Sequence, residues 1–142
     1  MVLKHKGHIA LISVHGDPAA EIGKEAAGGQ NVYVRQVGEA LARRGWNVDM
    51  FTRRCQPSQV KIVEHDSRCR TIRLDAGEPT YIDRDNLYHY VPEFVDSFMQ
   101  FQHQSGVIYP LIHTNTGRTI PGVFPASTYS LTATGSSTRG KI

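Results

Sequence analysis

The stretch that decides the fold is Gly28-Gly29-Gln30-Asn31-Val32-Tyr33-Val34, which follows an apolar run over residues 9–14. Two adjacent glycines leave the backbone without Cβ atoms, so its N–H groups can turn toward a bound group. The helix that we predict to begin here adds unpaired N–H donors and the positive end of its dipole at the same place. A strand, a glycine-rich turn and a helix N-terminus together predict a phosphate or anion site in an α/β domain.

The segments around this stretch extend the α/β pattern. Apolar residues continue at helical spacing up to about residue 41, and two arginines followed by Gly45 are typical of a helix C-terminus. Residues 46–52 are then predicted as a second strand, parallel to the first. Further strands are predicted over 60–64, 71–74 and 107–113, although Pro110 fits the last of these poorly because it has no N–H to donate.

A second helix is predicted to begin near Pro92, since proline is well suited to a first helical turn. Its expected apolar face consists of Phe94, Val95, Phe98, Met99 and Phe101. The segment 116–142 is rich in Ser and Thr and has neither helical nor alternating periodicity, so we predict an irregular or disordered tail.

Composition excludes several classes of function. The chain has 142 residues, the size of one domain, and no apolar run that could span a bilayer. Its net charge of +3 comes entirely from Arg118, Arg139 and Lys141, because residues 1–115 hold 13 basic and 13 acidic side chains. No basic stripe is present, so we expect no nucleic-acid partner. Cys55 and Cys69 can pair, but reduced thiols and a cytoplasmic location are the better expectation.

Several separate motifs, in order along residues 7–115, resemble the N-terminal domain of glycosyltransferase family 4, closest to its sucrose-phosphate synthase and sucrose synthase branch. The motifs are Ser13-Val-His-Gly-Asp-Pro18, Gly28-Gly-Gln-Asn-Val-Tyr-Val34, Ala40-Leu-Ala-Arg-Arg-Gly45 leading into Val48-Asp-Met-Phe-Thr52, Pro92-Glu-Phe94 and Leu111-Ile-His-Thr-Asn115. The resemblance implies a Rossmann-like parallel sheet with flanking helices, as the partial N-terminal, acceptor-side domain of a two-lobed GT-B enzyme. It also implies retaining transfer of a hexosyl group from a nucleotide diphosphate sugar to a sugar acceptor.

The resemblance also implies the site residues. Gly28 and Gly29 would approach the diphosphate of a UDP-, ADP- or GDP-sugar, which is a co-substrate; no cofactor and no metal are expected. His113 stands at the first histidine of a family motif, and Asn115 replaces a second histidine that contacts the donor sugar, which argues against a general base there. No catalytic residue is assigned within this chain.

Three further polar residues have two readings each. His15 either caps the first strand or faces a ligand, because strand carboxyl ends line the crevice of open α/β sheets. Asp17 either caps a turn or binds acceptor hydroxyls. Asn31 is either a helix N-cap or a substrate ligand.

Two other classes of function compete with an enzyme fragment. A non-catalytic nucleotide- or sugar-binding module stays open. A dinucleotide-binding Rossmann domain is disfavoured, because the Gly-x-Gly-x-x-Gly turn is missing and no acid follows the second strand.

Past Asn115 the chain departs from the family pattern. We hypothesise a frameshift near codon 116 in a gene for a longer enzyme; the alternative is a genuine short protein with a disordered tail. Because the second lobe would supply much of the transition-state stabilisation, we expect the chain alone to be inactive and poorly soluble.

Overall fold

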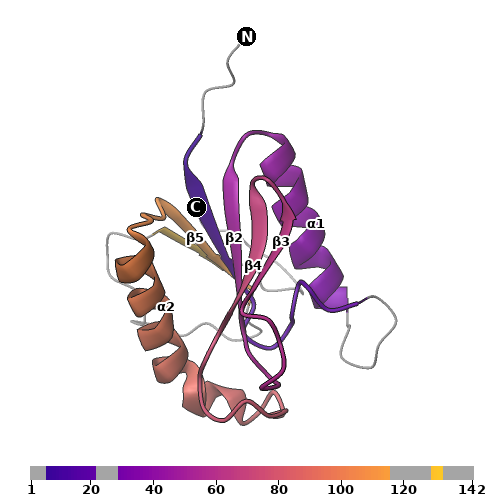
Figure 1. The fold of residues 1–142 in the computed structure, drawn as a ribbon, viewed down its shortest axis with the longest axis vertical. Coiled ribbons are helices and arrows are strands. Elements are labelled where there is room, and N and C mark those ends of the chain that lie inside the picture. Colours follow the sequence, from indigo (N-terminus) through magenta and orange to yellow (C-terminus); the bar gives the residue numbers. More distant parts are fainter. Residues whose placement is uncertain (1–5, 22–28, 116–128, 133–142) are drawn as a thin grey trace.

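The computed structural model describes residues 6–21, 29–115 and 129–132. One sheet has the strand order β3-β4-β2-β1-β5-β6, with α1 on one face and α2 on the other (Figure 1). The strands are β1 (His8–Ile12), β2 (Asn47–Arg53), β3 (Ile62–Asp66), β4 (Cys69–Leu74), β5 (Leu111–Thr114) and β6 (Tyr129–Thr132). The helices are α1 (Gly29–Arg43), the 3-10 turn η1 (Leu87–Tyr90) and α2 (Val91–Ser105). The predicted Rossmann-like α/β fold is confirmed.

Alternation along β1 explains why both faces of the sheet are covered. Ile9 and Leu11 pack in the cluster under α1, whereas Ala10 and Ile12 pack in the cluster under α2. Strands β1, β2, β4, β5 and β6 are parallel to one another, and β3 pairs with β4 antiparallel. A parallel sheet that is apolar on both faces requires helices on both sides.

The predicted apolar face of α2 is only partly right. Phe94 and Phe98 are buried against Phe51, whose ring lies 4.8 Å from that of Phe98. Met99 is instead 44% exposed, because it lies one position beyond Phe98 and points away from the sheet.

The predicted strand over 107–113 is also corrected. In the structure β5 begins at Leu111, directly after Pro110. Proline has no N–H and therefore cannot contribute a ladder donor. Tyr109 lies outside the strand, yet it is only 4% exposed.

The expectation of an irregular segment over 116–142 is wrong at four residues. Tyr129–Thr132 forms β6, which pairs in parallel with β5, with Leu111 opposite Tyr129. Without this pairing the backbone N–H and C=O groups along that edge of β5 would have no strand partner, which is the physical reason for an added strand. The remainder of the predicted tail lies outside the described residues.

Near the amino-terminal ends of the strands, Asp49 forms a buried polar centre. Its side chain is 4% exposed and accepts hydrogen bonds from Arg70 Nε at 2.6 Å and Arg70 Nη2 at 3.1 Å. The Tyr109 hydroxyl donates to the second carboxylate oxygen. Burial, and then the charge of Asp49, raise the pKa of Tyr109, which keeps this hydroxyl a donor. Asp49 therefore ties β2 to β4 and to the chain just before β5.

His65 on β3 predicts a pH dependence of stability. Its Nε2 lies 2.8 Å from Thr71 Oγ1; burial, and then the charge of Arg35, lower the pKa of His65 below 6.5. The unfolded chain binds the proton more readily, so the free energy of unfolding should decrease as pH falls through 6.5 toward the lowered pKa. Urea titrations on the two sides of this range should show a smaller decrease for His65→Gln than for the wild type. An equal decrease in both would contradict the assignment. Three nearby carboxylates act in the opposite direction, those of Glu39, Asp17 and Asp66.

Candidate functional site

The carboxyl ends of β1, β2 and β5 are held together beyond the strands themselves. The Ser13 N–H donates to the Phe51 carbonyl at 2.8 Å, and the Arg53 N–H donates to the Val14 carbonyl at 3.2 Å. On the other side of β1, the Asn115 N–H donates to the Ile12 carbonyl at 2.7 Å. These bonds align three loops at one edge of the sheet, beside the first turn of α1 (Figure 1).

Gln30, in the first turn of α1, connects two of these strand ends. Its side-chain amide Nε2 donates to Ser13 Oγ at 3.2 Å and to the Asn115 carbonyl. Ser13 is fully buried, Asn115 is 8% exposed and Gln30 is half-buried, so this link is partly shielded from solvent. Gln30 is not among the predicted site residues. The one feature of the sequence that could have indicated it is its position directly after the glycine pair.

Both predicted donor-site glycines stand before this link. Gly29 is exposed and is the first residue of α1, where N–H groups without intrahelical partners are expected. Gly28 lies outside the described residues. The phosphate contact of the pair stays a prediction, and the position of Gly29 at a helix start is consistent with it.

Asp17 holds the loop after β1. Its Oδ1 accepts a hydrogen bond from the Ala19 N–H at 2.8 Å, and its Oδ2 accepts one from Arg73 Nε at 2.9 Å. The two side chains are 15% and 9% exposed. The contact with the Ala19 N–H agrees with the first interpretation of Asp17, that it caps a turn. Binding of acceptor hydroxyls by Asp17 stays a prediction.

Asn31 lies inside α1, so the reading as an N-cap is wrong. A cap residue must precede the first helical turn, and the helix begins at Gly29. Asn31 is 6% exposed and packs against Gly16, at whose Cβ position its Oδ1 would be only 2.7 Å away. Its role as a substrate ligand stays a prediction.

Gly16→Ala tests this contact. The new methyl group would meet Asn31 Oδ1 at 2.7 Å and Ser13 Oγ at 2.9 Å. Overpacking of this kind should reduce the free energy of unfolding by about 1–3 kcal/mol. A urea titration measures the effect, and Gly29→Ala is the control, because nothing lies within 4 Å of its Cβ position. Equal stabilities of the two variants would contradict the close contact.

The two predicted histidines occupy different positions. His15 lies three residues past the end of β1. Its side chain reaches the surface, but partial desolvation of the imidazole, followed by the positive charge of Arg84, lowers its pKa and favours the neutral form. His113 pairs with Leu11 in the β1–β5 register and so shares the face of the sheet that α1 covers. His15, Asp17, Asn31 and Asn115 thus gather at the strand ends, with His113 two residues before the last of them.

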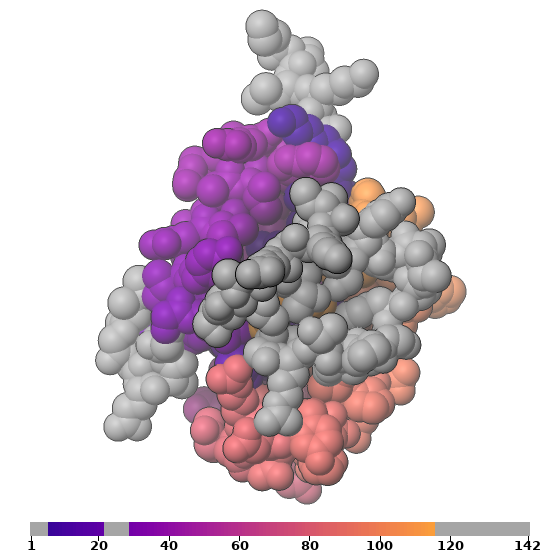
Figure 2. Space-filling model, turned by 180° about the vertical axis from the view of Figure 1, so that it is seen from behind, coloured from indigo at the N-terminus to yellow at the C-terminus, as the bar shows by residue number. Residues whose placement is uncertain are grey.

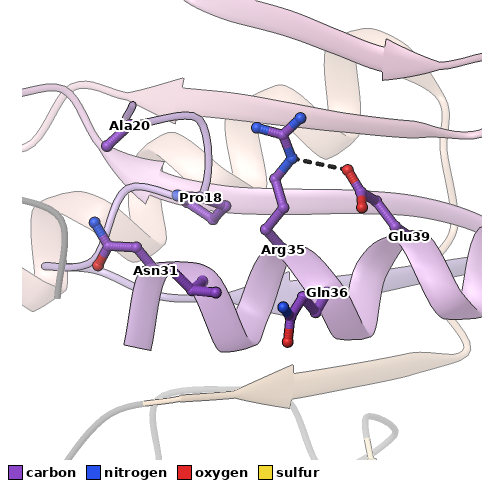
Figure 3. Close-up of a pocket in the computed structure, with 7 residues that line it drawn as sticks. Pro18, Ala20, Asn31, Arg35, Gln36 and Glu39 are labelled. Carbon is purple, nitrogen blue, oxygen red and sulfur yellow. Dashed lines mark hydrogen bonds and ion pairs between the residues drawn. The ribbon is translucent and has the colours of Figure 1, made fainter. Parts of the chain in front are cut away.

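A hollow lies beside this edge, between the 17–20 loop and α1. It has a volume of about 250 Å³ and is lined by Pro18, Ala20, Asn31, Val32, Arg35, Gln36 and Glu39 (Figure 3). Arg35 Nε and Glu39 Oε1 are 2.9 Å apart, so the cation in the hollow is paired. Substrate pockets usually exceed about 300 Å³. This hollow has room for a small group only and offers an anion no free charge.

Over residues 6–21, 29–115 and 129–132, no three His, Cys, Asp or Glu side chains are arranged to hold a metal ion. Cys55 and Cys69 are free thiols. Burial raises the pKa of Cys69 to about 12, which makes this thiol unreactive.

Arg53 is a second residue that the sequence interpretation missed. It ends β2, is 1% exposed, and directs its guanidinium at the loop after β4. Nε donates to the Ala76 carbonyl at 2.7 Å, Nη1 to the Thr80 carbonyl at 2.9 Å, and Nη2 to the Glu78 carbonyl. The loop over residues 76–80 is therefore anchored beside the ends of β1 and β2.

A family model for the glycosyl transferase 4-like domain matches residues 28–128. The chain belongs to this family. The matched region includes the start of α1 at Gly29 and the end of β5. The hydrogen bond from Gln30 to the Asn115 carbonyl joins these two places.

The chain is also similar to individual glycosyltransferases. A solved structure of sucrose-phosphate synthase from Thermosynechococcus elongatus is 58% identical, with a TM-score of 0.71, over 78% of this chain and 27% of its own. A second structure of sucrose-phosphate synthase from that organism is 48% identical, with a TM-score of 0.61, over 76% of this chain and 50% of its own. D-inositol 3-phosphate glycosyltransferase from Corynebacterium urealyticum is 38% identical over 107 residues, 75% of this chain and 25% of its own.

The glycosyltransferase relatives are much longer than the matched region. The chain spans about a quarter of the length of the curated relatives, 25% for the proteins of Corynebacterium urealyticum and Corynebacterium efficiens. In the described part of the chain, neither α1 nor α2 is long and apolar enough to cross a membrane.

Proposed function

We propose that this chain forms the acceptor-side part of a retaining hexosyltransferase that uses a nucleotide diphosphate sugar and a phosphorylated sugar acceptor. The observation that carries the proposal is the 58% identity with sucrose-phosphate synthase over 78% of the chain. The names of both kinds of relative, sucrose-phosphate synthase and D-inositol 3-phosphate glycosyltransferase, contain a phosphorylated polyol or sugar. Because a phosphorylated compound stands in both names, we propose that the acceptor carries the phosphate.

The site supports this reaction chemically. Transfer of the sugar leaves a nucleoside diphosphate, so negative charge increases on the phosphate oxygens in the transition state. N–H groups at the start of α1, next to Gly29, would stabilise that charge without reorganising. The link from Gln30 to Ser13 and Asn115 holds this helix start rigidly against the strand ends. The enzyme acts in the cytoplasm in our proposal, because its two free thiols suit a reducing compartment.

A chimera tests the proposal. Residues 6–115 of this chain replace the matching N-terminal segment of Thermosynechococcus elongatus sucrose-phosphate synthase, and product formation is measured by mass spectrometry. UDP-, ADP- and GDP-glucose are the donors; fructose 6-phosphate and D-inositol 3-phosphate are the acceptors. We expect transfer to fructose 6-phosphate, with retention at the anomeric carbon.

The remainder of that enzyme without the graft is the control, and it should be inactive. A folded chimera that binds the donor and transfers nothing to either acceptor would contradict the proposal. Such binding without turnover would favour the non-catalytic module instead.

A further inference from the structure

The loop that follows β1 is fixed by its own turn and by a side chain from β4. Asp17 closes the turn: its carbonyl accepts the Ala20 N–H at 3.1 Å, and its Oδ1 accepts the Ala19 N–H at 2.8 Å. The second carboxylate oxygen, Oδ2, accepts a hydrogen bond from Arg73 Nε at 2.9 Å. Arg73 therefore sets where this turn lies relative to β4.

Arg73 is itself held in place on β4. Its N–H donates to the Lys61 carbonyl at 2.7 Å, and its Nη1 donates to the Val60 carbonyl at 2.8 Å. The side chains of Arg73 and Asp17 are only 9% and 15% exposed. Because apolar side chains often stabilise a core as well as a buried ion pair does, stability alone does not account for this pair. What the guanidinium provides is direction, since its rigid plane donates to two acceptors at once.

The fixed loop also contacts the first turn of α1. The position of a Cβ on Gly16 lies 2.7 Å from Asn31 Oδ1 and 3.5 Å from Gln30 Cγ, so the loop backbone packs closely on that turn. Figure 3 shows the loop beside the first turns of α1, with Asn31 on the helix. The helix lies at the surface along one side of the molecule (Figure 2), and Gly29 at its start is exposed. A series of contacts thus runs from β4 through the loop to the start of α1.

We infer that Arg73 is a positioning residue: by holding the loop over residues 16–20, it fixes the first turn of α1, where the diphosphate of the donor would bind. This role rests on the proposed function, and it adds a residue from β4, a strand that holds none of the predicted site residues. Arg73 acts through Asp17 and the loop, and it has no part in the chemical step.

The test compares Arg73→Met and Arg73→Lys with Arg54→Met in the full chain. Arg54 is the matched control, because it also pairs with one carboxylate, that of Asp75 at 2.7 Å, and donates to one carbonyl, that of Pro57 at 3.4 Å. Its partners lie outside the loop after β1. Arg73→Lys keeps the charge and loses the planar fork, so its effects should be smaller. It also keeps the test decisive if Arg73→Met does not fold.

The first readout is hydrogen exchange, measured by mass spectrometry as the rate for residues 13–21 relative to that for β2. We expect this ratio to rise by about tenfold in Arg73→Met, because the turn loses its link to β4, and by less in Arg73→Lys. It should stay unchanged in Arg54→Met. An unchanged ratio in the Arg73 variants, or an equal rise in Arg54→Met, would overturn the positioning role.

The second readout is the affinity for inorganic diphosphate, followed by the NMR signal of the Gly29 amide. We expect the dissociation constant to rise by about tenfold in Arg73→Met and to stay within about threefold in Arg54→Met. A pair with a purely structural role would lower the free energy of unfolding in urea without changing this constant. A less stable Arg73→Met that binds diphosphate as the wild type does would therefore overturn the link to the donor site.

Asp17→Ala, alone and combined with Arg73→Met, shows whether Arg73 acts through Asp17. The two effects on diphosphate affinity should not add, because either change breaks the same contact. Additive effects would overturn the route through Asp17. Failure of the wild-type chain to bind diphosphate would count against the proposed function and the link to the donor site, and the exchange ratio would still decide whether Arg73 holds the loop.

Discussion

Replacement of Asp49 by alanine should lower the free energy of unfolding by about 3–5 kcal/mol, the range for removing one partner of a buried ion pair. The Asp49 side chain is 4% exposed and accepts two hydrogen bonds from Arg70 and one from the Tyr109 hydroxyl. In Asp49→Ala the guanidinium keeps its charge and the hydroxyl keeps its proton, and neither has an anionic acceptor. The Arg70 side chain is 31% exposed, so partial hydration should keep the loss near the lower end of the range.

Urea unfolding of the full chain measures this loss, and Asp75→Ala is the control. Asp75 pairs with Arg54 at 2.7 Å and with Lys61 at 3.4 Å, but its side chain is 48% exposed. Exposed pairs contribute about 0–1 kcal/mol, so the control should be nearly neutral. Similar losses in the two variants would show that the Asp49 centre contributes no more than a surface pair.

Replacement of Gly77 by alanine should lower the free energy of unfolding by about 2–5 kcal/mol. Its φ of +67° lies in the left-handed region, which costs a residue with a Cβ about 1–2 kcal/mol. The new methyl group would also lie 2.5 Å from Cδ1 and 2.6 Å from Cε1 of Tyr90, which adds an overpacking cost of about 1–3 kcal/mol.

Gly106→Ala separates the two contributions. Gly106 has a φ of +69° after the end of α2, and nothing lies within 4 Å of its Cβ position. It should therefore show the backbone cost alone. Thermal and urea unfolding of both variants give the difference, and Gly77→Ala must be the less stable one. The reverse order would contradict the packing of Tyr90 over the loop.

The regular elements could be predicted because their signals are local. Helical spacing after the glycine pair predicted α1, and short apolar segments after it predicted β2 and β4. Two strand predictions were wrong, the first because of a single local residue and the second because of strand pairing. Pro110 delays the start of β5, and Tyr129–Thr132 becomes a strand because β5 offers an open edge, which no pattern within those four residues reveals.

The candidate site was predictable only in part. Residues that follow strands, such as His15 and Asn115, were expected at the carboxyl edge, and the structure places them there. Gln30 escaped prediction because its partner Asn115 is 85 residues away in the chain. Arg53 escaped it because its partners are backbone carbonyls, which carry no sequence signal.

By itself, the sequence determined the α/β order of the elements and the family, since these follow from local periodicity and short motifs. Only the tertiary structure decided which side chains work together: Gln30 with Asn115, Asp17 with Arg73, and Arg53 with the loop after β4. The physical reason is that hydrogen bonds between distant segments depend on strand order and register, and both are settled when the whole sheet packs against α1 and α2.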